Sequence, residues 1–313
     1  MFSYIQSQWS QGRKIYGNHS WREARRTALH TVRSLKNKKE ISALEAYFKA
    51  YKPMPNLLEV HVGLYELMSR IFLYKDSTVT ERLEAIINHF DYMKQYLKDE
   101  TIQFLYGSDK EPYDAIGEEP VRGFLVWQDP ELEMKARLFF AAGQRKEGLV
   151  TLLLTIDGHG IYHANFRFGK GFHQEPAMWI GTIQGYKEGL DNAKKATKKM
   201  YGYRPKSFIM FLLRELAKSM QVESIYAVSD AGFYANTHLI RGHKAKVAFL
   251  DPLWEEVEGA VCEDARFYQI PIEEYRKPIE EIKSQKRSQY RNRYALLDQY
   301  ADDIREMMCA YLK

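Results

Sequence analysis

The sequence has few cysteines, no long apolar run and none of the common nucleotide-binding motifs. Its two cysteines, Cys262 and Cys309, have neither the spacing of a metal site nor that of a disulfide framework. We therefore expect no metal and a reducing, cytoplasmic setting. No run of about 18 apolar residues is present, which argues against a membrane-spanning helix. Residues 1–9 lack the charged start, apolar core and cleavage site of a signal peptide.

The composition is that of a folded protein with an uneven charge distribution. Of its 313 residues, 45% are hydrophobic and 14% aromatic, enough to bury a sizeable core. The net charge is only +5, but Arg13 to Lys39 contains nine basic residues and one acidic residue. Lys187 to Lys206 contains seven basic and two acidic residues. These patches suit an anionic partner; solvated helix faces are the alternative.

Sequence patterns divide the chain into four parts. Residues 1–106 predict a helical N-terminal region, in which Ser20 and Glu23 have the spacing of a capping box. Residues 107–133 are rich in turn formers and acids, and we interpret them as a linker and the entry to a sheet. Residues 134–275 predict an α/β domain, and 276–313 a long C-terminal helix.

Apolar runs rich in β-forming residues predict the strands. Short links containing glycine separate the first three runs, as in antiparallel hairpins. A fourth run precedes two helices, the second beginning near Pro205, and a further strand follows. The predicted strands are 134–142, 149–156, 161–168, 178–185 and 224–229, with weaker candidates at 247–250 and 267–271, while 102–106 also looks like a short strand. The fold class is therefore α+β, with a mixed, mainly antiparallel sheet.

The order of these elements resembles the GNAT acyltransferase fold. In that fold, a turn and the N-terminus of a helix hold the pyrophosphate of acyl-CoA. The corresponding turn here contains Gly202, Tyr203, Arg204, Lys206 and Ser207. Two cations at a helix N-terminus favour a dianionic group, so we expect these residues to bind acyl-CoA or acyl carrier protein. An ordinary basic helix start is the alternative, because Pro205 removes one amide.

Candidate catalytic residues follow the strand predicted at 224–229. Ser229 and Asp230 lie at its end, and His238 comes eight residues later. Such a set can support proton transfer or nucleophilic attack. No G-x-S-x-G element surrounds Ser229, and Asp230 capping the next segment is the alternative.

Thr197 and four short segments resemble the VirK/YbjX family of Gram-negative bacteria. The four segments are Ile180-Gly181-Thr182-Ile183-Gln184-Gly185, Gly202-Tyr203-Arg204-Pro205-Lys206, Tyr226-Ala227-Val228-Ser229 and Asp251-Pro252-Leu253-Trp254-Glu255. The resemblance covers about residues 20–300, and the Gly-x-Arg-Pro-Lys element is its most specific part. Asp230 stands where an asparagine is expected. The family implies a bacterial protein linked to virulence, stress response, envelope integrity and antimicrobial-peptide resistance, but no known reaction.

Together these observations predict a GNAT-like acyltransferase with an envelope-related acceptor. The alternative is a non-enzymatic accessory factor. Its basic faces would dock to anionic lipid at the inner membrane or to a protein partner. Nucleic-acid binding by the region from Arg13 to Lys39 is a third and less favoured class.

Overall fold

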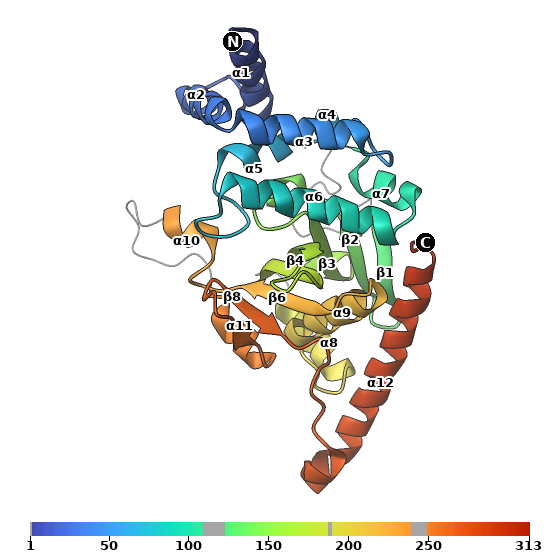
Figure 1. Ribbon diagram of the computed structural model, residues 1–313. Coiled ribbons are helices and arrows are strands. Elements are labelled where there is room, and N and C mark those ends of the chain that lie inside the picture. Colours follow the sequence, from blue (N-terminus) through green and yellow to red (C-terminus); the bar gives the residue numbers. More distant parts are fainter. Residues whose placement is uncertain (1, 109–122, 187–189, 239–248) are drawn as a thin grey trace.

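The computed structural model describes residues 2–108, 123–186, 190–238 and 249–313. The chain forms N-terminal helices, an eight-stranded mixed sheet and a long C-terminal helix (Figure 1). This confirms the predicted α+β class. The N-terminal helices are α1 Phe2–Tyr16, α2 Trp21–Lys36, α3 Lys38–Ala50, α4 Leu57–Val60, α5 Glu66–Ser69, α6 Val79–Tyr96 and α7 Asp99–Tyr106.

Side-chain caps fix the starts of α2 and α6. The Ser20 hydroxyl accepts a hydrogen bond from the Glu23 amide, and the Glu23 carboxylate accepts one from the Ser20 amide. This is the predicted capping box. Thr78 and Glu81 form the same arrangement at α6.

The strand predicted at residues 102–106 is wrong, because this segment forms the second half of α7. Ile102, Leu105 and Tyr106 are buried at helical spacing. The Tyr106 hydroxyl donates to the Leu149 carbonyl (2.9 Å), which fixes α7 against the sheet. A short apolar run can be helix or strand, and tertiary packing decides here.

The sheet has the order β1-β2-β3-β4-β5-β6-β8-β7, and its neighbours are antiparallel except for β5 and β6. The strands are β1 Phe124–Asp129, β2 Met134–Phe139, β3 Val150–Ile156, β4 His159–Lys170, β5 Pro176–Gly185, β6 Ser224–Val228, β7 Ala260–Val261 and β8 Phe267–Ile270. The five main strand predictions and the 267–271 candidate are confirmed. The 247–250 candidate lies partly outside the described residues, and 249–250 form no strand.

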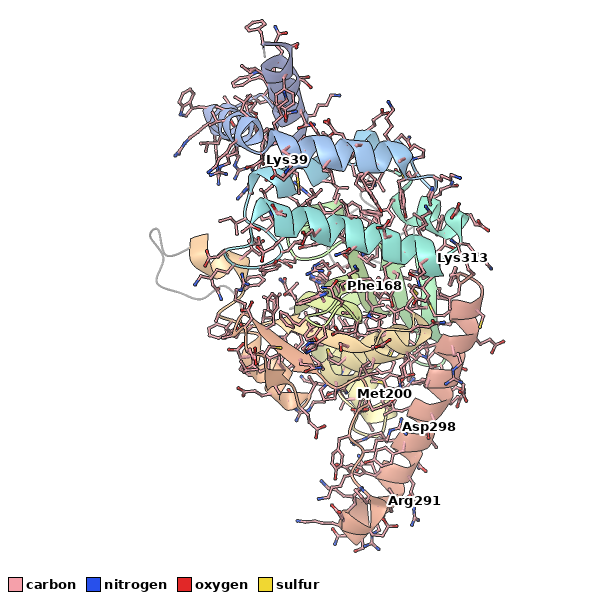
Figure 2. All side chains as sticks on the ribbon, viewed as in Figure 1. Lys39, Phe168, Met200, Arg291, Asp298 and Lys313 are labelled. Carbon is pink, nitrogen blue, oxygen red and sulfur yellow. The ribbon has the colours of Figure 1, made fainter. Side chains whose placement is uncertain are left out.

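Helices cover both faces of the sheet (Figure 1). On one face, His89 and Tyr92 of α6 stack with Phe168 of β4. Figure 2 labels Phe168 below α6. The other helices are α8 Leu190–Lys199, α9 Pro205–Ser219, α10 Tyr234–His238, α11 Asp251–Glu256 and α12 Ser284–Cys309. Buried Trp127 of β1 contacts Phe208 of α9 and Tyr300 of α12, so three elements share one aromatic contact.

The parallel strands β5 and β6 pair over only part of their length. Pairing runs from Ala177–Ile180 on β5 to Ser224–Ala227 on β6, and β5 continues to Gly185 after β6 has ended. A bulge in β5 at Gly181 shifts its register with β4. A Cβ atom at Gly181 would lie 1.7 Å from the Glu147 carbonyl oxygen, so only glycine permits this close approach.

Candidate functional site

The turn between α8 and α9 is held against the C-terminal helix. Gly202 has φ +78°, which favours glycine. The preceding carbonyl, of Tyr201, accepts hydrogen bonds from Gln289 (2.9 Å) and from Arg293 (2.7 and 3.1 Å) of α12. The Gly202 amide donates to the Thr197 carbonyl (2.7 Å) and therefore closes α8.

The side chains of the predicted donor site point to different partners. Tyr203 is buried, and its hydroxyl donates to Glu274 (2.6 Å). Lys206 forms a half-exposed ion pair with Glu256 of α11 (2.8 Å). Arg204 is exposed, and no ion pair joins it to the part of the chain that the structure describes.

The first turn of α9 can still contribute donors to an anion. Pro205 is the first residue of α9, as predicted. The amides of Lys206 and Ser207 belong to that first turn, where amides lack an intrahelical acceptor. With Arg204 beside them, they form a polar helix start, and Phe208 in the next turn contacts Trp127 of β1 and Tyr300 of α12.

The predicted catalytic residues hold the end of β6 in place. The buried Ser229 hydroxyl donates to the Ala265 carbonyl (2.7 Å) and accepts from the Gly232 amide (3.0 Å). The Asp230 carboxylate accepts from the Leu250 amide (2.5 Å), and the Asp230 amide donates to the Asp251 carboxylate (2.7 Å), so Asp230 joins the end of β6 to the start of α11. His238 ends α10, and its side chain lies outside the described residues.

A further polar group, Glu147, lies where β5 leaves β6. Its backbone packs on Gly181. Its carboxylate accepts from the Asn165 amide (3.2 Å), and the Tyr234 hydroxyl of α10 is a second hydrogen-bond partner. Burial raises the pKa of Glu147 to about 7, with these two hydrogen bonds acting in the opposite direction. A carboxyl group with this pKa can exchange a proton near neutral pH.

Sequence patterns did not identify Glu147. It lies in the link between β2 and β3, and acidic residues are common in such solvent-facing links. Asn165 holds it from β4 and is itself fixed by Thr151 of β3 (2.8 Å). Only the folded sheet brings these residues together with Tyr234 of α10.

The described residues contain neither a membrane-spanning helix nor a cluster of metal ligands. None of the helices combines the length and apolar character needed to cross a bilayer. In the same part of the chain, no three His, Cys, Asp or Glu side chains are grouped so that they could hold a metal ion.

These features define an α+β protein with a partly paired parallel strand pair and a basic start to α9. The chain belongs to the family described as "Protein of unknown function (DUF535)", whose model matches residues 19–306. The family membership predicted from the sequence is therefore confirmed.

Three relatives are all described as uncharacterized. YbjX of Escherichia coli is 36% identical over 157 residues, which covers 49% of this chain and 47% of YbjX. A Haemophilus influenzae protein is 35% identical over 136 residues, covering 42% of this chain and 44% of that protein. Thus these two alignments span about half the length of the relatives. A second H. influenzae protein is 22% identical over 314 residues and 96% of both chains.

Proposed function

We propose that this protein is a GNAT-like acyltransferase that uses acyl-CoA or an acyl-carrier donor and acts on an envelope-related acceptor. The observation that carries the proposal is the β5/β6 pair. It is the one parallel pair in the described sheet, it is joined through α8 and α9, and its pairing ends at Ile180, one residue before the bulge at Gly181. Because β5 continues to Gly185 after β6 has ended, an extended donor arm would lie along this part of β5.

The donor phosphates would be held at the start of α9. There the amides of Lys206 and Ser207, the helix dipole and the Arg204 guanidinium favour an anion. The Lys206 ammonium would exchange its half-exposed partner Glu256 for the donor, at little cost because such surface pairs are weak.

Glu147 is the group best placed to act as the general base. Acyl transfer needs the acceptor to lose a proton as it attacks the donor carbonyl. Glu147 adjoins the bulge and has a pKa near neutrality. In this proposal Ser229 and Asp230 position the end of β6, since their side chains bond to backbone groups there.

Donor binding tests the proposal. Calorimetric titration with acetyl-, octanoyl- and palmitoyl-CoA and with acylated carrier protein should show binding by at least one donor. The double variant Arg204→Ala, Lys206→Ala should bind that donor at least tenfold more weakly. Lys195→Ala, Lys198→Ala removes the same charge from exposed positions on α8 and should leave binding unchanged. Absence of binding by every donor, or equal losses in both variants, would reject the proposal.

A second candidate function, docking to anionic lipid, is favoured by the surface of α2. Apolar residues of α2 face outward: Trp21 is 83% exposed and Val32 64%, and Leu29 and Leu35 are also exposed. The buried side of the helix is polar instead, with residues Thr27, His30, Thr31 and Ser34. An exposed apolar face among arginines is typical of a membrane-surface helix.

Vesicle sedimentation tests this second candidate. The protein should bind vesicles rich in phosphatidylglycerol, not pure phosphatidylcholine, and high salt should release it. Trp21→Ser with Val32→Ser should abolish binding, whereas Val261→Ser, an exposed apolar position on β7, should not. Equal binding to both vesicle types would exclude an electrostatic contribution.

A further inference from the structure

Three arginines are buried in the described chain, and Arg167 differs from the other two in its hydrogen bonding. Arg82 donates to the Leu67 and Ser77 carbonyls, and Arg214 donates to the Pro271 (2.9 Å) and Val257 (3.0 Å) carbonyls. Arg167, only 8% exposed, has no hydrogen bond or ion pair from its side chain to any described residue. Its guanidinium instead lies over the Trp179 ring, 4.8 Å from the ring centroid.

The Arg167 guanidinium carries an uncompensated charge. Burial lowers the pKa of Arg167 to about 10, so the group stays protonated at neutral pH. A buried charge without a partner is costly, and proteins usually pair such groups. We therefore expect the partner of Arg167 to come from outside the described chain, as a bound ligand would.

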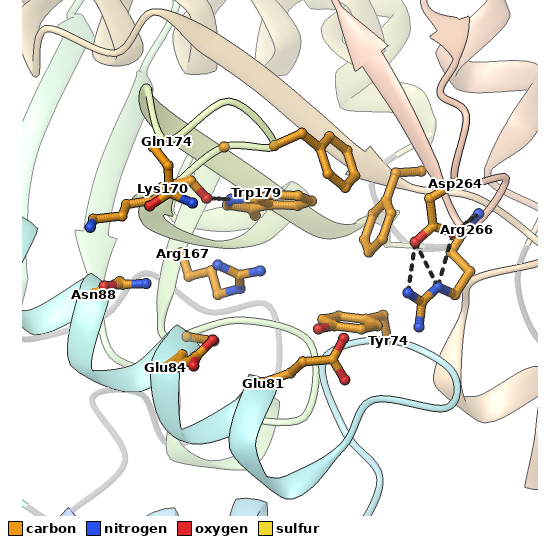
Figure 3. A pocket seen from close by; sticks show the side chains of 14 residues that line it. Tyr74, Glu81, Glu84, Asn88, Arg167, Lys170, Gln174, Trp179, Asp264 and Arg266 are labelled. Carbon is orange, nitrogen blue, oxygen red and sulfur yellow. Dashed lines mark hydrogen bonds and ion pairs between the residues drawn. The ribbon is translucent and has the colours of Figure 1, made fainter.

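Arg167 points into a pocket of about 530 Å³ between α6, the β4–β5 hairpin and β8 (Figure 3). This volume suits a small organic molecule. Aromatic side chains form much of the wall: Tyr74, Phe172, Trp179 and Phe267. The Trp179 indole is fixed by donation to the Lys170 carbonyl (3.0 Å), so this wall has a defined orientation.

Most other charges of the pocket already have partners. Arg266 pairs with Asp264 (2.6 Å), as the dashed lines in Figure 3 show. Glu81 accepts from the Thr78 amide (2.6 Å) as part of the α6 cap. Arg167 is thus the buried cation whose donors face the pocket, with exposed Lys170 at its mouth.

We propose that this pocket binds a small organic carboxylate, with its anionic group on Arg167 and its apolar body against the aromatic wall. The planar guanidinium matches a carboxylate with two parallel hydrogen bonds. Three acidic residues, Glu81, Glu84 and Asp264, line the same pocket. They repel further negative charge, which favours a monoanion over a phosphate. The proposal stands independently of acyl transfer.

Ligand-observed NMR with three probes tests the binding. Benzoate should bind the wild-type protein with a millimolar dissociation constant, as expected for a fragment. Its neutral isostere benzamide and phenyl phosphate should bind at least tenfold more weakly. Benzoate binding should weaken at least tenfold in Arg167→Met. It should weaken at least threefold in Arg167→Lys and in Phe172→Ala. No benzoate binding, equal binding of benzamide, tighter binding of phenyl phosphate, or unchanged binding in Arg167→Met would each overturn the proposal.

Thermal unfolding gives a second readout that needs no ligand. Arg167→Met removes an unpaired charge, so its melting temperature should equal or exceed that of the wild type. Arg214→Met is the matched control: it leaves two buried carbonyls without donors and should melt several degrees lower. If Arg167→Met melts as low as Arg214→Met, Arg167 is a structural residue and the proposal fails.

Discussion

At the residue level, buried His89 makes hydrogen bonds that require its neutral ring. The Phe168 amide donates to His89 Nδ1 (3.1 Å), so that nitrogen carries no proton. His89 Nε2 lies 2.8 Å from the Tyr106 hydroxyl, which itself donates to the Leu149 carbonyl. The single ring proton is therefore on Nε2. Protonation of Nδ1 would break the bond from β4.

Stability should decrease on mild acidification. Burial lowers the pKa of His89 to about 3 and that of His30 and His163 to about 4, from 6.5. The unfolded chain therefore takes up protons first as the pH falls below about 6.5. Each of the three histidines should lower the free energy of unfolding by roughly 2 kcal/mol between pH 7 and pH 5. Glu147, whose pKa is raised to about 7, acts in the opposite direction by roughly the effect of one histidine. Urea unfolding at the two pH values measures this.

His163→Phe provides the control for that prediction. Both ring nitrogens of His163 are buried without a partner among the described residues. The variant should be at least as stable as the wild type at pH 7 and lose less stability at pH 5. An identical pH dependence in the two proteins would contradict the assignment.

Glu147 should govern the pH dependence of any acyl transfer. Glu147→Gln preserves the shape of the side chain but removes the base, so the rate should fall about 100-fold or more. The decrease in rate below about pH 7, which protonation of Glu147 causes in the wild type, should also disappear. Thiol release from the bound acyl-CoA measures the rate, and Glu100→Gln on the exposed face of α7 is the control. A full rate in Glu147→Gln would assign the base elsewhere.

At the level of elements, the bulge in β5 depends on a single glycine. Gly181→Ala would place a methyl group against the Glu147 carbonyl and should destabilise the protein by about 1–3 kcal/mol. Gly169→Ala on β4 meets its nearest atom at 3.4 Å and should have little effect. Urea unfolding of both variants compares them. If Gly181→Ala is as stable as Gly169→Ala, the bulge does not depend on this glycine.

The elements themselves were largely predictable, because local signals agreed with the final packing. The capping box at Ser20, Pro205 at the start of α9 and the glycine-separated strands all retain their sequence-predicted roles. Residues 102–106 and the apolar face of α2 were less informative. For residues 102–106 packing selected a helix, and in α2 the apolar residues Trp21, Leu29, Val32 and Leu35 are exposed.

For the molecule as a whole, helices α3 to α7 and the sheet share one hydrophobic core. A continuous cluster of buried residues extends from Ile41 of α3 to Met308 of α12. The chain end also returns to α6, where the Lys313 amide donates to the Tyr96 carbonyl (2.9 Å). We therefore expect a single calorimetric unfolding transition. Two transitions, with the N-terminal helices melting separately, would contradict a shared core.

The candidate site could be predicted only in part, because its members come from distant segments. The basic start of α9 was identifiable as a local pattern of Arg204, Pro205 and Lys206. Glu147 and Arg167 gained their properties only from burial and from their neighbours in the sheet. No local pattern distinguishes a buried arginine without partners from one that binds backbone carbonyls.

Hydrogen–deuterium exchange with and without a bound acyl-CoA tests the central claim most directly. The account predicts slower exchange in the second half of β5, at the end of β6 and in the first turn of α9, because the donor would lie between them. The double variant Arg204→Ala, Lys206→Ala should lose this protection. Protection confined to other segments, or none with any donor, would contradict the proposed donor site.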